Sequence, residues 1–557
     1  MILACRYVLR FLRKGIPSLF SDLSALCRAS PAKAEALEAM FSKAAAGLKK
    51  DGTLGFSTLA TGETEDPACL VWVLFFQAQF YDQAERWAEA LAAIDAAVEH
   101  TPSIADFYLC KARILRNAGD TAAAWKLADE ARKMDLADRY LNSECTKIML
   151  QADEVDTAHD TIALFARDGE QKQSNLHEMQ SVWFETEAGM SHLRREQYGQ
   201  ALAQLTRVGG HFADMTEDQF DFHTYCLRKM TLRAYVDLLR MEERLHGHPS
   251  YCRAAYGVVR AYVGVADQEV MSDTERKVVN EEEKKARKAK LKAAKERRAA
   301  EQAKREEEDR ERRAAGKASI KRNKEEEDRK AKEEDEAASA DPAAALAAVA
   351  NPLAEAAKPL ELLQLHACRR LQTHQLAFEV YLRQGSVMLA LRAVRRMRLL
   401  SPTHCATHSA TVRLLHYVVG QKAAAAAGDG EAAARLPAVV LGVVDAAAAA
   451  MGVPKASSVA DLVTFNKAFE ASNASSLPHV MTAARMEALL MPGAAAAAAA
   501  ARVLGLKGKL AGVDGRDLFN GHRLLAGPLA AAAAAKEWAV ACAALNPVDP
   551  RWKALAA

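Results

Sequence analysis

The sequence predicts an all-α protein, built as a superhelix of stacked helical hairpins and interrupted by one long charged helical insertion. Three observations indicate this fold. A pattern of small and large apolar residues returns at a fixed interval, half of the 557 residues are hydrophobic, and no strand-rich segment accompanies the pattern. One segment, residues 281–336, consists almost entirely of charged residues and alanine, so it cannot bury a core.

The repeated pattern is clearest between Val71 and Leu136. The first copy has the spacings of a tetratricopeptide unit, in which small residues let two antiparallel helices approach, at Leu74, Ala78, Tyr81, Ala90, Ile94, Ala97 and Pro102. About 34 residues later, the length of one unit, the same residue classes return except for the closing proline, at Tyr108, Ala112, Leu115, Ala124, Ala128, Ala131 and Leu136. One hairpin cannot bury its apolar faces alone, so the hairpins should stack and form a concave binding wall.

The other helical elements follow in chain order. Residues 1–50 are expected to form helices with a turn at Gly15 and Pro17. A third unit is expected over residues 139–165, and helix breaks are expected near Gly169 and at Gly209–Gly210. A fourth unit is indicated by Gly189, His192, Ala201, Leu205 and Val208.

Residues 218–240 are predicted to form a single long helix with two apolar stripes. Two stripes imply contact on two sides, as inside a solenoid. One stripe contains His223, which we interpret as a core histidine with satisfied hydrogen bonds and not as a ligand or base. The second stripe contains Phe222, Tyr225, Leu232, Val236 and Leu239.

The charged insertion divides the chain into predicted regions. Its first part is polybasic, with nine basic residues and one acidic residue between positions 284 and 298, and its second part mixes both signs in runs suited to a solvated helix. The insertion is either a solubilising linker or an arm for RNA phosphate. The predicted regions are residues 1–270 (repeats), 271–341 (insertion), 342–420 (further repeats) and 421–557 (alanine-rich helices).

Repeats are expected to resume after the insertion. The tetratricopeptide spacing returns at Phe378, Tyr381, Ala390, Val394, Met397 and Pro402. Beyond Gly420, alanine runs favour helices but carry little packing information. Residues 436–453 are apolar but contain Asp445, so a buried solenoid helix is favoured over a membrane span.

Composition and motifs argue against several functions. Lysine and arginine (75) barely exceed aspartate and glutamate (72), which disfavours a globally basic nucleic-acid binder. Phosphate-loop, dinucleotide-binding, metalloprotease and nucleophile-elbow motifs do not occur, so an enzyme is not indicated. The ten cysteines form no C-x-x-C pair, so a reduced cytosolic chain without structural zinc is expected.

Basic side chains in the second and third units are predicted to share one groove. The tetratricopeptide register directs Arg113 and Arg116, and then Tyr140 and Lys147, toward the inside of the superhelix. Several like charges in one groove repel unless an anion lies among them, so a polyphosphate is a candidate ligand. A solvated basic face, or a surface that pairs with a partner, remains the alternative.

Several segments resemble the auxiliary subunit of the N-terminal acetyltransferase A complex. The resemblance covers about residues 6–490, and its segments occur in family order: RKGIPSLF (13–20), LVWVLFFQAQFYD (70–82), VEHTP (98–102), DLADRYLNSECTKIMLQAD (135–153), EDQFDFHTYCLRKMTLRAYVDLLR (217–240), THQLAFEVYLR (373–383) and SSLPHVMTAARM (475–486). The family has several further repeats before the first of these segments, so this chain is expected to lack the family's N-terminal repeats.

The resemblance implies a non-catalytic scaffold. Family members form a tetratricopeptide superhelix that wraps a GNAT-fold catalytic acetyltransferase, directs it toward small N-terminal residues and tethers it to the ribosome. A cytoplasmic, ribosome-associated protein is therefore expected, with a possible small regulatory subunit and no membrane. The ribosomal (rRNA phosphate) contact is assigned to Lys284, Lys285, Arg287, Lys288, Lys290, Lys292, Lys295, Arg297 and Arg298.

The family also holds inositol hexakisphosphate between its two subunits. The resemblance assigns this structural ligand, the one cofactor expected, to Lys111, Arg113, Arg116, Arg139, Tyr140 and Lys147. Glu144 departs from the family pattern, which tends to be basic there, and is expected to weaken the anion site.

Two other functions stay open. A general tetratricopeptide adaptor would capture a short acidic C-terminal peptide in its groove. A free RNA-binding protein would act through residues 284–298 and would not need the repeats.

Overall fold

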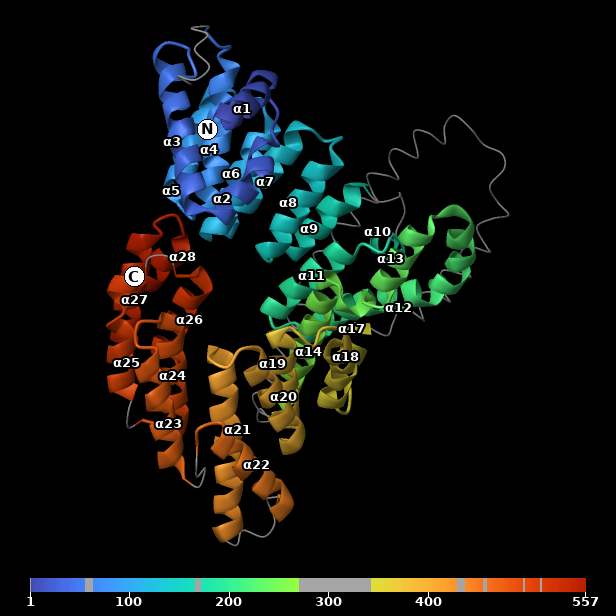
Figure 1. Ribbon diagram of the computed structural model, residues 1–557, viewed down its shortest axis with the longest axis vertical. Helices are drawn as coiled ribbons and strands as arrows, with labels where there is room; N and C mark the ends of the chain where they lie inside the picture. Colours follow the sequence, from blue (N-terminus) through green and yellow to red (C-terminus); the bar gives the residue numbers. More distant parts are fainter. Residues whose placement is uncertain are drawn as a thin grey trace, which may run out of the picture. The chain divides into compact units, whose positions relative to one another are not determined.

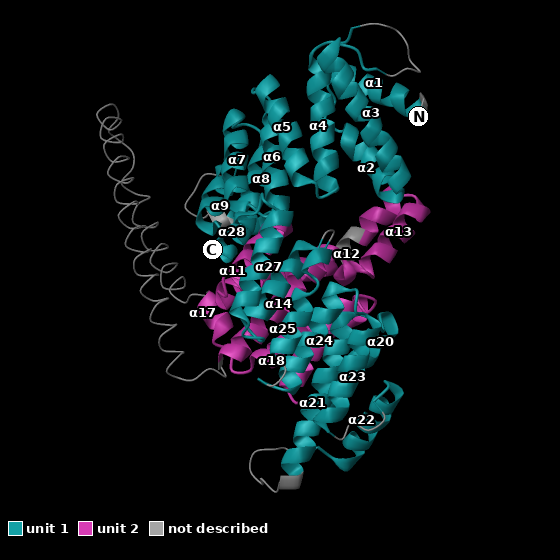
Figure 2. Ribbon diagram, turned by 90° about the vertical axis from the view of Figure 1, so that its left-hand side faces the viewer, with its two compact units in different colours: residues 1–179, 387–557 teal, residues 180–386 magenta. Residues whose placement is uncertain are grey.

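The computed structural model describes residues 2–55, 64–165, 172–269, 342–427, 436–453, 458–493, 496–510 and 513–557 (Figure 1). Those residues form helices and connecting loops, with no strand among them, which confirms the all-α prediction. The chain divides into two compact units, Met1–Met179 with Val387–Ala557, and Gln180–Ser386 (Figure 2). The predicted charged insertion, residues 271–341, lies outside the described residues.

The first unit begins with an aromatic core. Three helices, α1 (Ile2–Lys14), α2 (Leu19–Ala29) and α3 (Pro31–Lys50), pack against α4 (Ala68–Gln83). Phe76 of α4 stacks on Phe41 of α3, with ring centroids 3.7 Å apart. The predicted turn is also present, because Gly15 adopts a left-handed conformation with φ of 63° between α1 and α2.

Three helical hairpins follow in the same unit. They pair α4 with α5 (Trp87–His100), α6 (Ala105–Ala118) with α7 (Thr121–Met134), and α8 (Arg139–Gln151) with α9 (Val155–Ile162). In each hairpin the connecting turn has one residue with positive φ: Glu85, Gly119 and Asp153. These residues recur every 34 positions, so the predicted period is confirmed. The small residues of the pattern, such as Ala78, Ala90, Ala112 and Ala124, are fully buried.

The rest of the first unit is helical as well. It contains η2 (Ala163–Phe165), α10 (Lys172–Glu178), α20 (Val387–Leu400), α21 (Cys405–Ala427), α22 (Ala438–Ala450), α23 (Val459–Ser472), α24 (Leu477–Leu490), α25 (Ala496–Leu504), η4 (Lys507–Lys509), α26 (Gly515–Ala526), α27 (Ala532–Leu545) and α28 (Pro550–Ala556). The alanine-rich helices share a core around the fully buried Trp538 and the almost fully buried Trp552.

The second unit contains the fourth predicted hairpin. Its elements are α11 (Val182–Arg194), α12 (Tyr198–Lys229), α13 (Leu232–Glu242), η3 (Leu245–Gly247), α14 (Pro249–Glu269), α17 (Pro342–Ala347), α18 (Pro352–His366) and α19 (Leu371–Arg383). Ala201, Leu205 and Val208 of α12 are buried, as the pattern predicted. Phe378 and Tyr381, which were predicted to resume the repeats, are buried in α19.

Two predicted helix boundaries are wrong. The expected break at Gly209–Gly210 does not occur, because α12 runs through both glycines and is stabilised by packing against α11, α14 and α17. The expected single helix over residues 218–240 is broken instead: α12 ends at Lys229, and the Thr231 side chain accepts a hydrogen bond from the Ala234 amide to start α13. The break predicted near Gly169 lies outside the described residues.

Two predicted buried surfaces are also wrong. The side chains of Tyr225 and Leu232 are 52% and 76% exposed, so the second stripe of residues 218–240 does not lie in a solenoid interior. Helix α22 is short and largely exposed, with Val439 at 78%, instead of being a buried solenoid helix. Within the described part of the chain, no helix has the length and apolar character needed to cross a membrane.

Candidate functional site

The predicted groove residues come from the first helices of two successive hairpins. Arg113 and Arg116 lie on α6, and Tyr140 and Lys147 lie on α8. Helix α8 begins at a fixed point because the Asp138 carboxylate accepts a hydrogen bond from the Tyr140 amide at 2.7 Å. Tyr140, Glu144 and Lys147 are four and three positions apart, so they form one stripe along the helix.

Arg113 joins the two helices. Its guanidinium donates to the Tyr140 hydroxyl and, at 3.0 Å, to the Glu144 carboxylate. Burial lowers the pKa of Arg113, but the Tyr140 hydroxyl and the Glu144 carboxylate together raise it by more. The pKa of Arg113 therefore lies above its ordinary value. Arg113 therefore stays charged, and its nearest anion is a side chain of the protein itself.

Beside this pair, Arg116 joins Asn117 and Asp82 in a second hydrogen-bonded group, and neither Asn117 nor Asp82 was predicted. Arg116 donates to the Asn117 amide oxygen at 3.0 Å, and the Asn117 amide nitrogen donates to the Asp82 carboxylate of α4 at 2.8 Å. Burial raises the pKa of Asp82, although Asn117 and the nearby positive charges of Arg116 and Arg113 oppose the rise. The tetratricopeptide register could have found Asp82, because it is one 34-residue period before Arg116.

Two other residues predicted for the anion site, Lys111 and Arg139, make their contacts away from Arg113. Lys111 forms an ion pair with Asp95 of α5 at 2.7 Å. The Arg139 guanidinium lies over the Phe165 ring, 5.6 Å from its centroid. Among the described residues, neither Arg139 nor Lys147 forms an ion pair with a carboxylate.

These positions do not form an open cradle for inositol hexakisphosphate. Such a ligand needs several cations without a carboxylate between them. Here Glu144 lies between Tyr140 and Lys147 on α8 and pairs with Arg113 of α6. Lys111 pairs with Asp95, and Arg139 lies over the Phe165 ring. In this arrangement Glu144 opposes binding of the ligand, and the six-residue assignment stays a prediction.

The polybasic residues assigned to rRNA phosphate, from Lys284 to Arg298, lie outside the described residues. Their assignment also stays a prediction.

An exposed apolar surface occurs where α12 turns into α13. The side chains of Leu227 and Leu232 are 62% and 76% exposed, and Tyr225 and Met241 are about half exposed. No residue of α13 is buried. His223 is half-buried, and it hydrogen-bonds the Tyr235 hydroxyl at 3.1 Å and lies 3.7 Å from Glu242, which agrees with a structural histidine. Exposed large apolar side chains that gather on neighbouring helices are typical of contact surfaces.

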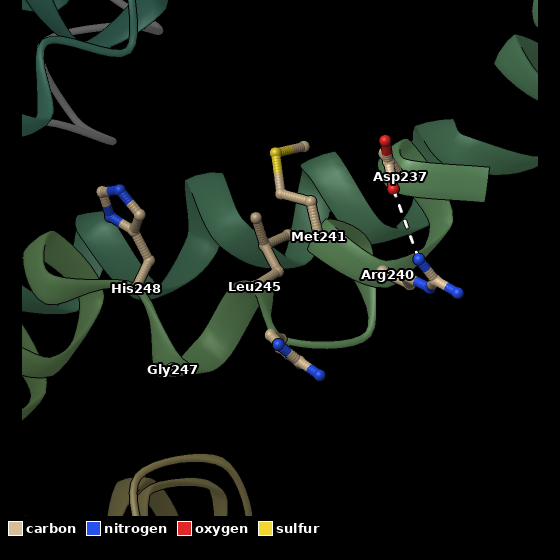
Figure 3. Close-up of a pocket in the computed structure, with 7 residues that line it drawn as sticks. Asp237, Arg240, Met241, Leu245, Gly247 and His248 are labelled. Atoms are coloured by element: carbon tan, nitrogen blue, oxygen red, sulfur yellow. Dashed lines mark hydrogen bonds and ion pairs between the residues drawn. The ribbon is translucent and has the colours of Figure 1, made fainter. Parts of the chain in front are cut away.

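Figure 3 shows a hollow beside α13. It is lined by Asp237, Arg240, Met241, Arg244, Leu245, Gly247 and His248, and Asp237 pairs with Arg240 at 3.4 Å. These lining residues include no serine, threonine, cysteine or lysine that could act as a nucleophile beside His248.

Known proteins resemble this chain over most of its length. A family model described as "N-terminal acetyltransferase A, auxiliary subunit" matches residues 2–397. The chain is 47% identical over 262 residues to the N-terminal acetyltransferase A complex auxiliary subunit NAA15 of Arabidopsis thaliana, covering 47% of this chain and 28% of that protein. It is 36% identical over 482 residues to N-alpha-acetyltransferase 16, NatA auxiliary subunit, of Homo sapiens, covering 86% of this chain and 53% of that protein.

A solved structure has a similar fold. It is described as Naa15/Naa10 bound to HypK-THB, and it matches with a TM-score of 0.57 and 26% identity over 80% of this chain and 54% of that chain. The chain thus spans about half the length of the human relative and of the solved chain. Because the family model matches well over half of its residues, the chain belongs to the family of N-terminal acetyltransferase A auxiliary subunits.

Proposed function

We propose that the protein is a non-catalytic scaffold that binds and activates a GNAT-fold catalytic acetyltransferase subunit for co-translational N-terminal acetylation. The observation that carries this proposal is the similarity to a chain solved in a complex described as Naa15/Naa10, over 80% of the present chain. The relatives are named auxiliary subunits, which supports a role without catalysis.

The exposed apolar surface of α12 and α13 supports a partner-binding role. Leu227 and Leu232 lie near the turn between the two helices, and both are mostly exposed. Burying two leucines at a protein interface contributes about 1.5–3 kcal/mol each. We assign this surface to the catalytic subunit.

The finer parts of the proposal concern other partners. Residues 284–298 would bind rRNA phosphate and hold the complex at the ribosome, in the cytoplasm. A small regulatory subunit would join as well, which is supported by the naming of HypK-THB in the similar solved complex.

The scaffold role is tested by co-expression with a GNAT-fold catalytic subunit. We expect the two chains to copurify, and we expect the complex to acetylate peptides with small N-terminal residues faster than the catalytic subunit alone. The present chain alone should show no acetyl transfer. Acetyl transfer by the isolated chain, or a catalytic subunit that elutes separately and at unchanged activity, would refute the scaffold role.

The ribosomal contact is tested by replacing the nine basic residues between Lys284 and Arg298 with glutamine in the full chain. Sedimentation with ribosomes should be lost, and binding of the unmodified chain should weaken steeply with salt. Unchanged sedimentation of the variant would exclude this arm. A chain that captures a short acidic C-terminal peptide instead of a folded partner would support the adaptor function.

A further inference from the structure

Glu144 lies in the middle of the stripe that Tyr140, Glu144 and Lys147 form along α8. Tyr140 is one turn before it and Lys147 is one turn after it on the same helix face. Its carboxylate is 3.0 Å from the Arg113 guanidinium of α6, and both side chains are only partly exposed, at 20% and 35%. The ion pair is therefore partly shielded from solvent, which strengthens it relative to a surface pair.

The charges around this stripe are nearly balanced. Arg113 and Arg116 on α6 and Lys147 on α8 supply three positive charges, while Glu144 and Asp82 supply two negative charges. Asp82 is held by Asn117, beside Arg116. Glu144 takes the position that a bound anion would need, because its carboxylate already accepts the hydrogen bond that Arg113 could donate to a phosphate.

We propose that Glu144 is an internal counter-anion, which joins two successive hairpins through Arg113 and keeps this groove from binding polyphosphates tightly. The groove does not need an added anion for stability. Neutralising Glu144 converts the same residues into a polyphosphate site, because Arg113 is then released from its carboxylate and no carboxylate remains between Tyr140 and Lys147.

The test measures inositol hexakisphosphate binding to the full chain by calorimetry at fixed salt and neutral pH. Glu144→Gln should bind this probe about tenfold more tightly than the unmodified chain, because a negative charge near the ligand is removed. Asp95→Asn is the matched control. It frees Lys111 from a similar ion pair at 2.7 Å, but Lys111 points toward α5, so binding should change by less than about twofold.

A double variant tests whether Glu144 acts through Arg113. If it does, the gain from Glu144→Gln should shrink several-fold in an Arg113→Gln background. A melting curve for each variant shows whether it is folded, and Glu144→Lys replaces Glu144→Gln if the latter does not fold. Tight binding to the unmodified chain, equal gains from Glu144→Gln and Asp95→Asn, or no gain from either Glu144 variant would overturn the proposal.

Discussion

Gly189 of α11 lies directly against Leu205 of α12, so close that a methyl group added at Gly189 would come within 2.4 Å of Leu205 Cγ. The contact lets the two helices of this hairpin approach, and Leu205 is 1% exposed. The backbone of one helix is therefore part of the packing surface of the other.

Gly189→Ala should destabilise the second unit by about 1–2 kcal/mol. The added methyl overlaps Leu205, and this strain exceeds the gain of about 1 kcal/mol in helix propensity. Gly210→Ala in α12 is the control, because nothing lies within 4 Å of its new methyl and the helix should gain about 0.5–1 kcal/mol. Thermal melts should move in opposite directions for the two variants, and a shared direction would contradict the packing argument.

Gly189 also shows what the sequence could predict. The period of small residues located the hairpins, because two helices can approach closely only where the residues between them are small, such as glycine or alanine. The continuation of α12 through Gly209 and Gly210 was not predictable from the same pattern, because packing against other helices stabilises the helix across these two glycines. At the groove, the register found Arg113, Tyr140 and Lys147. Asp82 shares that register, but its pairing through Asn117 does not follow from it, and Asp95 lies on the second helix of a hairpin, so both carboxylates were missed.

The core of the alanine-rich region was likewise not predictable, because alanine runs do not specify which residues meet. Trp538 is fully buried, donates to the Leu518 carbonyl at 3.0 Å and packs against Gly521.

Trp538→Ala should lower the free energy of unfolding by about 3–5 kcal/mol, because it opens a cavity in this core. Limited proteolysis should then cut residues 496–557 faster, whereas Val540→Ala on the exposed side of α27 should leave the rate unchanged. Equal rates for the two variants would count against this core.

Stability should depend on pH through His408. The ring stacks on Phe469 with centroids 3.7 Å apart, and its Nε2 lies 2.9 Å from Asn466 Oδ1. Burial lowers the pKa of His408 from 6.5 to about 4, helped by the nearby His479 and Arg398 and opposed by the bond to Asn466. Between pH 6.5 and 4, His408 is therefore protonated in the unfolded chain but neutral in the folded chain. The free energy of unfolding consequently decreases as the pH falls through this window.

The size of this effect is about 3 kcal/mol; it is nearly absent above about pH 7, grows as the pH falls, and is complete below about pH 4. His408→Gln should remove this part of the pH dependence while retaining a polar group near Asn466. Hydrogen exchange of α21, α23 and α24 at pH 7 and pH 5 measures the difference. The same pH dependence in both proteins would exclude His408 as its source.

Reversing charge in the groove should weaken the proposed complex. In the double variant Arg113→Glu with Lys147→Glu, Glu144 loses its partner on α6 and faces like charges at both changed positions, across on α6 and one turn along α8. The melting temperature of the complex should drop more than for the pair Arg395→Glu and Arg396→Glu, whose side chains are exposed on α20. A melt of the complex with and without added inositol hexakisphosphate also tests the ligand assignment.

Leu227→Asp with Leu232→Asp should reduce capture of the catalytic subunit. These side chains are mostly exposed, so the double variant should fold with a melting temperature within about 2 °C of the unmodified chain. Each aspartate would have to be desolvated at the interface, and the two should together weaken binding at least about a hundredfold. Leu399→Asp on α20, where the leucine is 77% exposed, is the matched control and should bind normally. If both variants bind equally in a calorimetric titration with the catalytic subunit, the α12–α13 surface is not its contact.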